Sequence, residues 1–176
     1  AASAWMAVTS EPVVGLFYER GAFDAVDTAA SASALVFFSL GIAFWALQAL
    51  MARGFYALQD TWTPMLLASG VTLAVLPIYG LLGDEYGHEG LAMATTIGMT
   101  LNAIVTTLVL RRKLPFGLGG LLRSFALSAL VAALGGAAAW GALQAVSGQG
   151  YLVRAVVASA AFGVVFAGAA TVLKVP

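Results

Sequence analysis

The sequence predicts an all-α protein, a polytopic membrane helical bundle with about five full transmembrane helices and a partial one at its start. Of its 176 residues, 61% are hydrophobic and 9% are charged, and the mean hydropathy is +0.96. A soluble domain of this size needs more charge to cover its surface. The runs 28–52 and 61–83 contain no Asp, Glu, Lys or Arg. Each run is therefore long enough to cross a bilayer core of roughly 30 Å as a helix.

The composition also limits the chemistry that this chain can perform. It has no cysteine and one histidine, which excludes a disulfide scaffold, a thiolate metal site and a multi-histidine metal centre. Basic and acidic residues number 8 each, so no net charge favours nucleic acid as a partner. The sequence contains no P-loop and no catalytic triad pattern, and no span carries paired carboxylates. We therefore expect no enzyme activity, no cofactor and no metal.

The chain is expected to begin with the last turns of a membrane span. This partial helix covers residues 1–14 and is predicted to end at Glu11-Pro12, because proline biases the preceding residue away from helical angles. Residues 18–27 are polar and predict a loop outside the membrane. Asp27 and Thr28 then predict the amino-terminal cap of the first full helix, residues 28–52.

One face of this first full helix carries a polar residue. Gly41, Trp45, Gln48 and Ala52 fall at helical spacing. A glutamine that faces lipid leaves its amide without a hydrogen-bond partner. We therefore expect this face to point toward protein or a wet cavity.

A polar turn, residues 53–64, separates the two uncharged runs. Thr63 is expected to cap the second helix, residues 63–82, with Pro64 in its first turn because the fixed φ of proline suits that place. Pro77 removes one backbone hydrogen bond, so it should kink this helix or end it early. The next stretch, residues 83–90, is the most acidic in the chain. Its spacing could suit a divalent cation, but a solvated loop is the favoured interpretation.

The remaining helices carry small residues at every fourth position, which allows neighbouring helices to approach closely. They are expected at residues 90–110, 121–146 and 151–173, and the short turn 147–150 makes the last two an antiparallel pair. The helix-packing glycines are expected to be Gly41, Gly98, Gly136 and Gly163.

The charges divide between the two ends of the predicted spans. One side carries Arg53, Arg111, Arg112, Lys113, Arg123 and Lys174, with Asp60 as its only acid. The other carries Arg20 and Arg154 with Glu11, Glu19, Asp24, Asp27, Asp84, Glu85 and Glu89. Because basic residues concentrate on the cytoplasmic side of membrane proteins, the turn 53–64 and the carboxyl terminus are expected to face the cytoplasm.

Several motifs together resemble a known family. The segment Phe55-Tyr-Ala-Leu-Gln-Asp-Thr-Trp-Thr-Pro64 is preceded by Glu11-Pro-Val-Val and Leu16-Phe-Tyr-Glu-Arg-Gly-Ala-Phe23, and it is followed by Gly90-Leu-Ala-Met-Ala-Thr95. In this order and spacing they resemble the MurJ/MviN family of lipid II flippases, over about Glu11 to Lys113. The resemblance implies a transporter of the multidrug/oligosaccharidyl-lipid/polysaccharide exporter superfamily, with two helical lobes around a central cavity.

The resemblance also implies a division of the chain. Residues 1–113 would form part of the carboxy-terminal lobe, and residues 114–176 would form two additional helices that border a groove for the lipid tail. The amino-terminal lobe, where the arginines proposed to hold the substrate diphosphate mainly lie, is expected to be missing, so that the chain is a fragment. Family members usually carry Asn where Ala74 aligns, so no polar role is expected at that position.

The implied function is movement of lipid II, the undecaprenyl-linked peptidoglycan precursor, across the bacterial inner membrane by alternating access. The expected partners are lipid II, membrane lipids and the missing lobe. Two alternatives stay open. One is an exporter of another polyprenyl-linked oligosaccharide or amphiphile, and the other is a truncated membrane scaffold that transports nothing.

Three residues are candidates for the substrate path: Gln48, Arg53 and Asn102. Arg53 could instead be an anchor that reaches the lipid headgroups from the end of its helix. Asn102 could instead hydrogen-bond to a neighbouring helix and hold the bundle together. For all three candidates, a structural role is favoured over a role in the substrate path.

Overall fold

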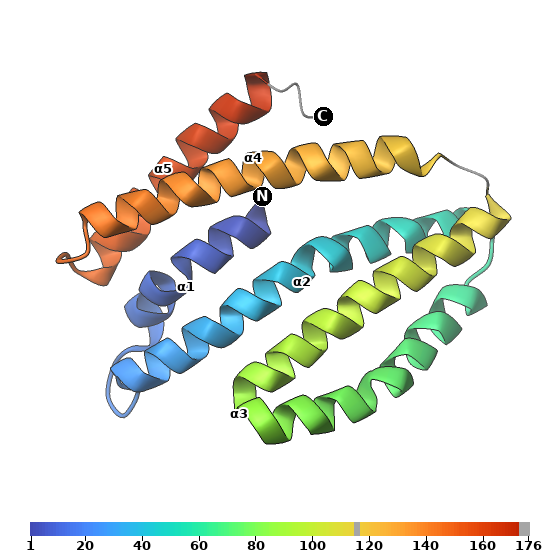
Figure 1. Ribbon diagram of the computed structural model, residues 1–176, viewed down its shortest axis with the longest axis horizontal. Coiled ribbons are helices and arrows are strands. Elements are labelled where there is room, and N and C mark those ends of the chain that lie inside the picture. Colours follow the sequence, from blue (N-terminus) through green and yellow to red (C-terminus); the bar gives the residue numbers. More distant parts are fainter. Residues whose placement is uncertain (115–116, 173–176) are drawn as a thin grey trace. The chain divides into compact units, whose positions relative to one another are not determined.

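The computed structural model describes residues 1–114 and 117–172, and this part of the chain is helical without a strand, as expected (Figure 1). Its helices are α1 (Ala2–Tyr18), α2 (Ala25–Ala57), α3 (Trp62–Lys113), α4 (Leu118–Ala145) and α5 (Tyr151–Val172). By length and composition, four segments can cross a membrane: Ala25–Ala57, Trp62–Lys113, Leu122–Ala145 and Tyr151–Val172. The predicted all-α membrane bundle is confirmed. Leu173, the expected end of the last helix, and Lys174 lie outside the described residues.

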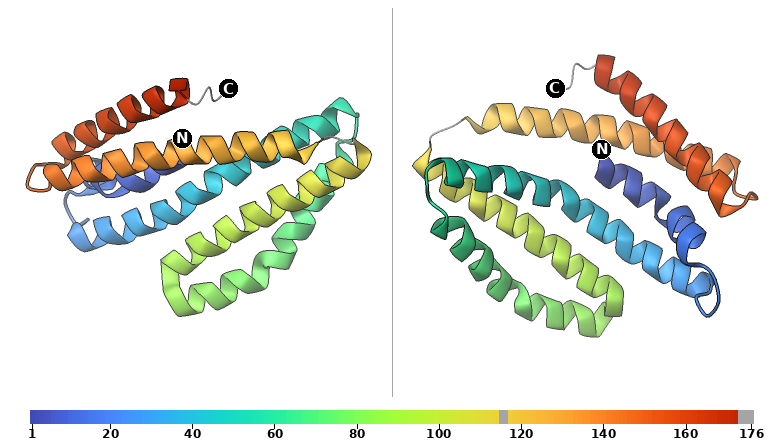
Figure 2. Two further views of the ribbon diagram at one scale, coloured as in Figure 1. Left: turned by 45° about the horizontal axis from the view of Figure 1, so that its top comes forward. Right: turned by 180° about the vertical axis from the view of Figure 1, so that it is seen from behind.

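Helix α3 accounts for a difference in helix number, because it joins two helices that the sequence predicted separately. It has 52 residues, so a straight helix would be about 78 Å long, far more than a bilayer core of about 30 Å. Gly87 has non-helical angles, φ 58° and ψ −131°, and there the helix folds back on itself (Figure 2). The two arms, residues 62–86 and 88–113, are each about 25 residues long and can each span the membrane.

The expected loop at residues 83–90 is therefore wrong in its extent, although the chain does reverse there. Residues on both sides of Gly87 stay helical, and the first arm continues through Pro77 with helical angles. A Cβ atom on Gly90 would lie 1.8 Å from the carbonyl oxygen of Leu82. Glycine at this position lets the second arm pass close to the backbone of the first, which makes a long loop unnecessary.

Helix α1 also runs further than expected. It continues through Pro12 to Tyr18, so Glu11-Pro12 does not mark its end. Proline inside a helix leaves one backbone carbonyl without its usual donor. The bias that Pro12 imposes on Glu11 is a tendency, and here the helical conformation prevails, with Pro12 buried.

In the turn before α2 and in the turn before α3, an aspartate accepts hydrogen bonds from backbone N–H groups at the start of the helix. Asp24, rather than Asp27 or Thr28, caps α2: its Oδ1 accepts hydrogen bonds from the backbone N–H groups of Val26 and Asp27, at 2.8 and 3.1 Å. At α3 the N-cap position is held by Thr61, so Thr63 is not the cap. The preceding Asp60 accepts a hydrogen bond through Oδ1 from the backbone N–H of Thr63 at 3.0 Å. Pro64 does lie in the first turn of α3, as expected.

The chain forms two compact units, each of which includes part of α2. Unit 1 comprises Ala1–Ser39 and Gly117–Pro176, and unit 2 comprises Leu40–Phe116. The division expected from the sequence, after residue 113, stays a prediction. Within unit 1, α1 packs against α4 and α5.

In unit 1 the core lies between α4 and α5. Ala139, Leu143, Ala158 and Phe162 are buried there, with Trp5 and Val8 of α1 packed against them. Glycine at position 135 of α4 allows the ring of Phe162 to pack closely, because a Cβ there would lie 3.0 Å from that ring. Large apolar side chains elsewhere, such as Val164, which is 74% exposed, lie on the surface that lipid would cover.

In unit 2 the carboxy-terminal part of α2 packs on the second arm of α3. A Cβ on Gly41 would lie 2.8 Å from Sδ of Met99, and one on Gly54 would lie 2.7 Å from Cδ2 of Leu110. The absence of a side chain at these glycines brings the two helices together.

Candidate functional site

Several polar residues of unit 2 line a pocket of about 200 Å³ between α2 and the two arms of α3. Its lining consists of Gln48, Val71, Thr72, Val75, Tyr79, Thr95, Gly98, Met99 and Asn102. Gln48 comes from α2, the residues from Val71 to Tyr79 come from the first arm, and the rest come from the second arm. Five of these nine residues have polar side chains, and none of them is charged.

Two of the three substrate-path candidates, Gln48 and Asn102, line this pocket. Both side chains are half-buried. They are 54 positions apart in the sequence and come together where α2 packs on the second arm of α3. The face that the sequence expected to point toward protein or a wet cavity does so at Gln48.

Arg53 lies outside the pocket. It is exposed near the end of α2, about one and a half turns beyond Gln48. Its neighbour Gly54 packs against Leu110, close to the basic residues Arg111 and Arg112. The structure therefore separates Arg53 from the other two candidates, and its exposed position suits an anchor at the membrane surface.

Hydrogen bonds hold several of the polar pocket residues in fixed positions. The hydroxyl of Tyr79 donates to Thr95 Oγ1 at 3.0 Å, which links the two arms of α3. Thr72 Oγ1 donates to the carbonyl oxygen of Ala68 at 2.9 Å. The hydroxyl of Thr106, which does not line the pocket, donates to Asn102 Oδ1 at 3.1 Å. Within the described part of the chain, the side chain of Gln48 makes no hydrogen bond.

Thr72, Tyr79 and Thr95 were not among the pocket residues predicted from the sequence. Thr72, Val75 and Tyr79 follow the spacing i, i+3 and i+7, so they share one helical face. That spacing could have indicated a common face with polar residues, but the neighbouring residues are mostly apolar and made this face difficult to recognise. The residues that face this side of the first arm could not be predicted, because they depend on where the chain reverses. The sequence locates the reversal at Gly87 only approximately.

The four expected packing glycines differ in their surroundings. Gly41 faces Met99, and a Cβ on Gly98 would lie 3.5 Å from Cγ1 of Val75, between the two arms of α3. A Cβ on Gly136 would lie 3.7 Å from Cγ2 of Val8, so α4 meets α1 there. Gly163 faces open space, with nothing within 4 Å in the described part of the chain.

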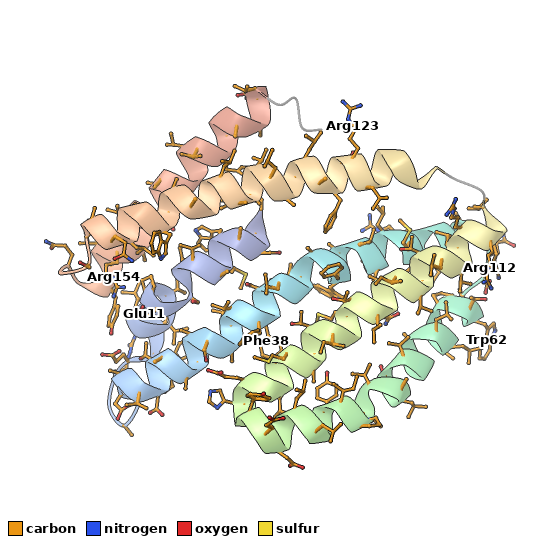
Figure 3. All side chains as sticks on the ribbon, in the orientation of Figure 1. Glu11, Phe38, Trp62, Arg112, Arg123 and Arg154 are labelled. Atoms are coloured by element: carbon orange, nitrogen blue, oxygen red, sulfur yellow. The ribbon has the colours of Figure 1, made fainter. Side chains whose placement is uncertain are left out.

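In unit 1, polar contacts join α1 to α5. Tyr151 donates a hydrogen bond to Glu19 Oε2 at 2.8 Å, and its ring covers Gly15, where a Cβ would lie 2.8 Å away. Arg154 Nη1 donates to Glu11 Oε1 at 3.0 Å, and these two side chains point toward one another (Figure 3). The Trp5 indole donates to Ser159 Oγ at 3.0 Å. These contacts fix α5 on α1 at several points along both helices.

Unit 1 also holds an apolar pocket of about 720 Å³ between α1 and the first part of α2. Its lining is Val13, Val14, Phe17, Tyr18, Ser31, Ala34, Leu35 and Phe38. The last two helices, which the family resemblance placed beside a groove for the lipid tail, contribute no described residue to it.

A family model decides the relationship of this chain. The model of the family described as lipid II flippase MurJ matches residues 1–162. The chain belongs to the MurJ family. Its helices that can cross a membrane accordingly belong to a multi-pass membrane protein.

Individual relatives agree with this assignment. The lipid II flippase MurJ of Thermosipho africanus is 34% identical over 88 residues, which are 50% of this chain and 18% of that protein. The probable lipid II flippase MurJ of Rhizobium meliloti is 35% identical over 113 residues, or 62% of this chain and 21% of that protein. The match therefore spans about a fifth of the length of these MurJ relatives.

The fold agrees with a solved MurJ structure. A lipid II flippase MurJ in an inward closed conformation superimposes with a TM-score of 0.68 at 20% identity. The superposition covers 98% of this chain and 36% of the solved one. The helical arrangement described above is thus that of a part of the solved MurJ fold.

Proposed function

We propose that this chain is part of a lipid II flippase, a transporter that moves the undecaprenyl-linked peptidoglycan precursor across the bacterial inner membrane. The observation that carries the proposal is the match of the MurJ family model to residues 1–162. Relatives across this family are named lipid II flippases, a name that describes a transporter rather than a catalyst. The chain covers a minor part of their length, so a working transporter would need the rest of a MurJ protein.

The proposed mechanism is alternating access, in which two lobes rock about a site near the middle of the membrane. Unit 2 supports this proposal with its pocket, because Thr72 and Asn102 lie about ten residues or more from the ends of the α3 arms. Such depth corresponds to roughly 15 Å, near the bilayer midplane. A polar pocket at that depth is costly in a protein that only needs to pack its helices.

Complementation tests the proposed function. The complete protein that contains this chain is expressed in a bacterium whose own lipid II flippase is depleted, and growth is measured. We expect growth to be restored to near the level given by the native flippase. Good membrane expression without growth would contradict the proposal and would favour a different polyprenyl-linked substrate or a scaffold without transport.

A further inference from the structure

The pocket of unit 2 offers hydrogen-bonding groups of both kinds that the protein itself does not use. The Gln48 amide has no partner within the described residues, so its NH₂ and its carbonyl oxygen are both available. Asn102 accepts from Thr106 through Oδ1, which leaves its NH₂ group available. The hydroxyls of Thr72 and Tyr79 donate elsewhere, so their oxygens can accept. Unused groups of this kind inside a membrane span are costly unless water or a ligand pairs with them.

The absence of charge from the pocket lining limits what can bind there. A diphosphate is normally held by Arg or Lys, whose cations give the strong charge-assisted hydrogen bonds that phosphate oxygens need. A divalent cation is normally held by carboxylates, and neither charge type is among the described residues that line this pocket. The ligand group that this lining can bind is therefore a neutral one with hydrogen-bond donors and acceptors, such as a sugar hydroxyl or an acetamido group.

The volume of the pocket sets the size of that group. It is about 200 Å³, below the range of roughly 300–1,000 Å³ that holds a drug-sized molecule. One sugar ring, or one acetamido substituent with part of its ring, is about as large as such a pocket allows. The apolar side chains of Val71, Val75 and Met99 supply the remaining contact surface.

We propose that the pocket lined by Gln48, Tyr79 and Asn102 binds an uncharged sugar or acetamido group of a lipid-linked glycan, separately from the site that holds the diphosphate. This inference rests on the proposed function, and it assigns one part of the substrate to one part of unit 2. Gln48 is the main contact, since its amide can donate to and accept from the same sugar. The diphosphate must then be held by residues outside this pocket.

The experiment compares two lipids that differ in their glycan. The complete protein is placed in lipid nanodiscs, and the binding of lipid II and of undecaprenyl diphosphate, which has no sugar, is measured for three proteins. These are the unchanged protein, Gln48→Leu and the matched control Gln144→Leu, which makes the same substitution at an exposed position of α4. We expect Gln48→Leu to weaken lipid II binding about tenfold, the effect of losing one or two well-placed hydrogen bonds.

Binding of undecaprenyl diphosphate should stay unchanged in Gln48→Leu, which also shows that the variant is folded. Gln144→Leu should match the unchanged protein for both lipids. The inference is overturned if Gln48→Leu weakens binding of the two lipids equally, or of neither. Thr72→Val, which removes one hydroxyl acceptor without changing the shape, should weaken lipid II binding by a smaller factor, and an unchanged value would also count against the pocket.

Failure of the proposed function gives a different result. If the unchanged protein binds neither lipid more tightly than phosphatidylglycerol, it is not a lipid II transporter, and the pocket loses its proposed ligand together with the function. If the unchanged protein binds lipid II and only the Gln48 comparison fails, the function stands and the pocket assignment alone is wrong.

Discussion

At the scale of single residues, a few carboxylates outside the spans position the ends of the helices. Asp24 caps α2, and Glu19 Oε2 accepts from the hydroxyls of both Thr28 and Tyr151, each at 2.8 Å. Asp60 accepts from the backbone and the hydroxyl of Thr63 and forms an ion pair with Lys113. Through Lys113, Asp60 joins the turn before α3 to the last residue of that helix, so it closes the hairpin at the end opposite Gly87.

The position of Asp60 makes the stability of this end dependent on pH. The hydrogen bond from Lys113 is the largest influence on its carboxylate, followed by those from Thr63, and together they lower its pKa from 3.8 to about 2. Because the pKa is lower in the folded state, the ionised carboxylate stabilises the fold at pH values above the pKa of the unfolded state. This contribution disappears as the pH falls from about 4 to about 2. We expect Asp60→Asn to lower the unfolding temperature measurably at a pH of about 5 to 8.

The pH profile of the difference identifies the cause. Thermal unfolding of the detergent-solubilised protein, followed by tryptophan fluorescence, should show the gap between Asp60→Asn and the unchanged protein closing below a pH of about 4. Asp84→Asn is the matched control, because Asp84 is exposed and makes no ion pair within the described part of the chain. A gap of constant size down to a pH of about 2 would show that the lost charge is not responsible.

Residues of this kind show where sequence reasoning reaches its limit. An aspartate or threonine before an apolar run indicates a helix start, and the sequence predicted Asp27 and Thr28 as the cap of α2 and Thr63 as the cap of α3. The pattern located each start within a few residues, but it could not choose the capping side chain. That choice depends on contacts such as Thr28 to Glu19, which involve a residue of another segment.

At the scale of elements, α3 depends on two glycines for its reversal. Gly87 has a positive φ of 58° with ψ −131°, a combination that costs other residues considerable strain. The polar, glycine-rich stretch 83–90 correctly indicated a reversal of the chain. The compactness of this reversal could not be predicted from the sequence. It results from the close approach of the Gly90 backbone to Leu82, which is a contact between the two arms.

Gly90→Ala is expected to disrupt the α3 hairpin. The new Cβ would lie 1.8 Å from the carbonyl oxygen of Leu82, a backbone atom that cannot move aside without breaking helical hydrogen bonds. We expect a loss of about 3 kcal/mol or more, comparable to the larger effects of overpacking, or failure to accumulate in the membrane. Thermal unfolding and the yield of solubilised protein measure this.

Gly80→Ala is the matched control in the same helix. No atom of the described residues lies within 4 Å of the position that its Cβ would take, and alanine favours helix over glycine by about 1 kcal/mol. Gly80→Ala should therefore equal or exceed the stability of the unchanged protein. Equal effects of the two substitutions would mean that the close approach at Gly90 does not exist in the folded protein.

At the scale of the whole molecule, the sequence predicted the fold class in full but the candidate site only in part. Hydropathy sufficed for a membrane bundle because uncharged apolar runs as long as a bilayer core are rare outside membrane spans. The sequence also indicated Gln48 and Asn102, since amides within spans stand out. It could not bring them to one pocket with Tyr79, because this requires knowing that α2 packs against both arms of α3.

The proposed orientation gives a prediction that uses the absence of cysteine from the chain. Basic residues gather at the ends of α2 and α3, so the turn that contains Gln59 should face the cytoplasm, and the turn between α4 and α5, which contains Gln149, should face outward. Gln59→Cys and Gln149→Cys are a matched pair, since both replace an exposed glutamine in a turn. In the complete protein, any cysteine outside this chain is first replaced by serine.

A membrane-impermeant maleimide applied to intact spheroplasts measures the orientation. It should label Gln149→Cys within minutes and leave Gln59→Cys unlabelled until the membrane is opened with detergent. The reverse pattern would place the acidic turns in the cytoplasm and contradict the orientation. The two arms of α3 and the single span of α4 lie between these turns, so the turns must face opposite sides of the membrane. Labelling of both cysteines in intact spheroplasts would therefore mean that α3 does not cross the membrane twice.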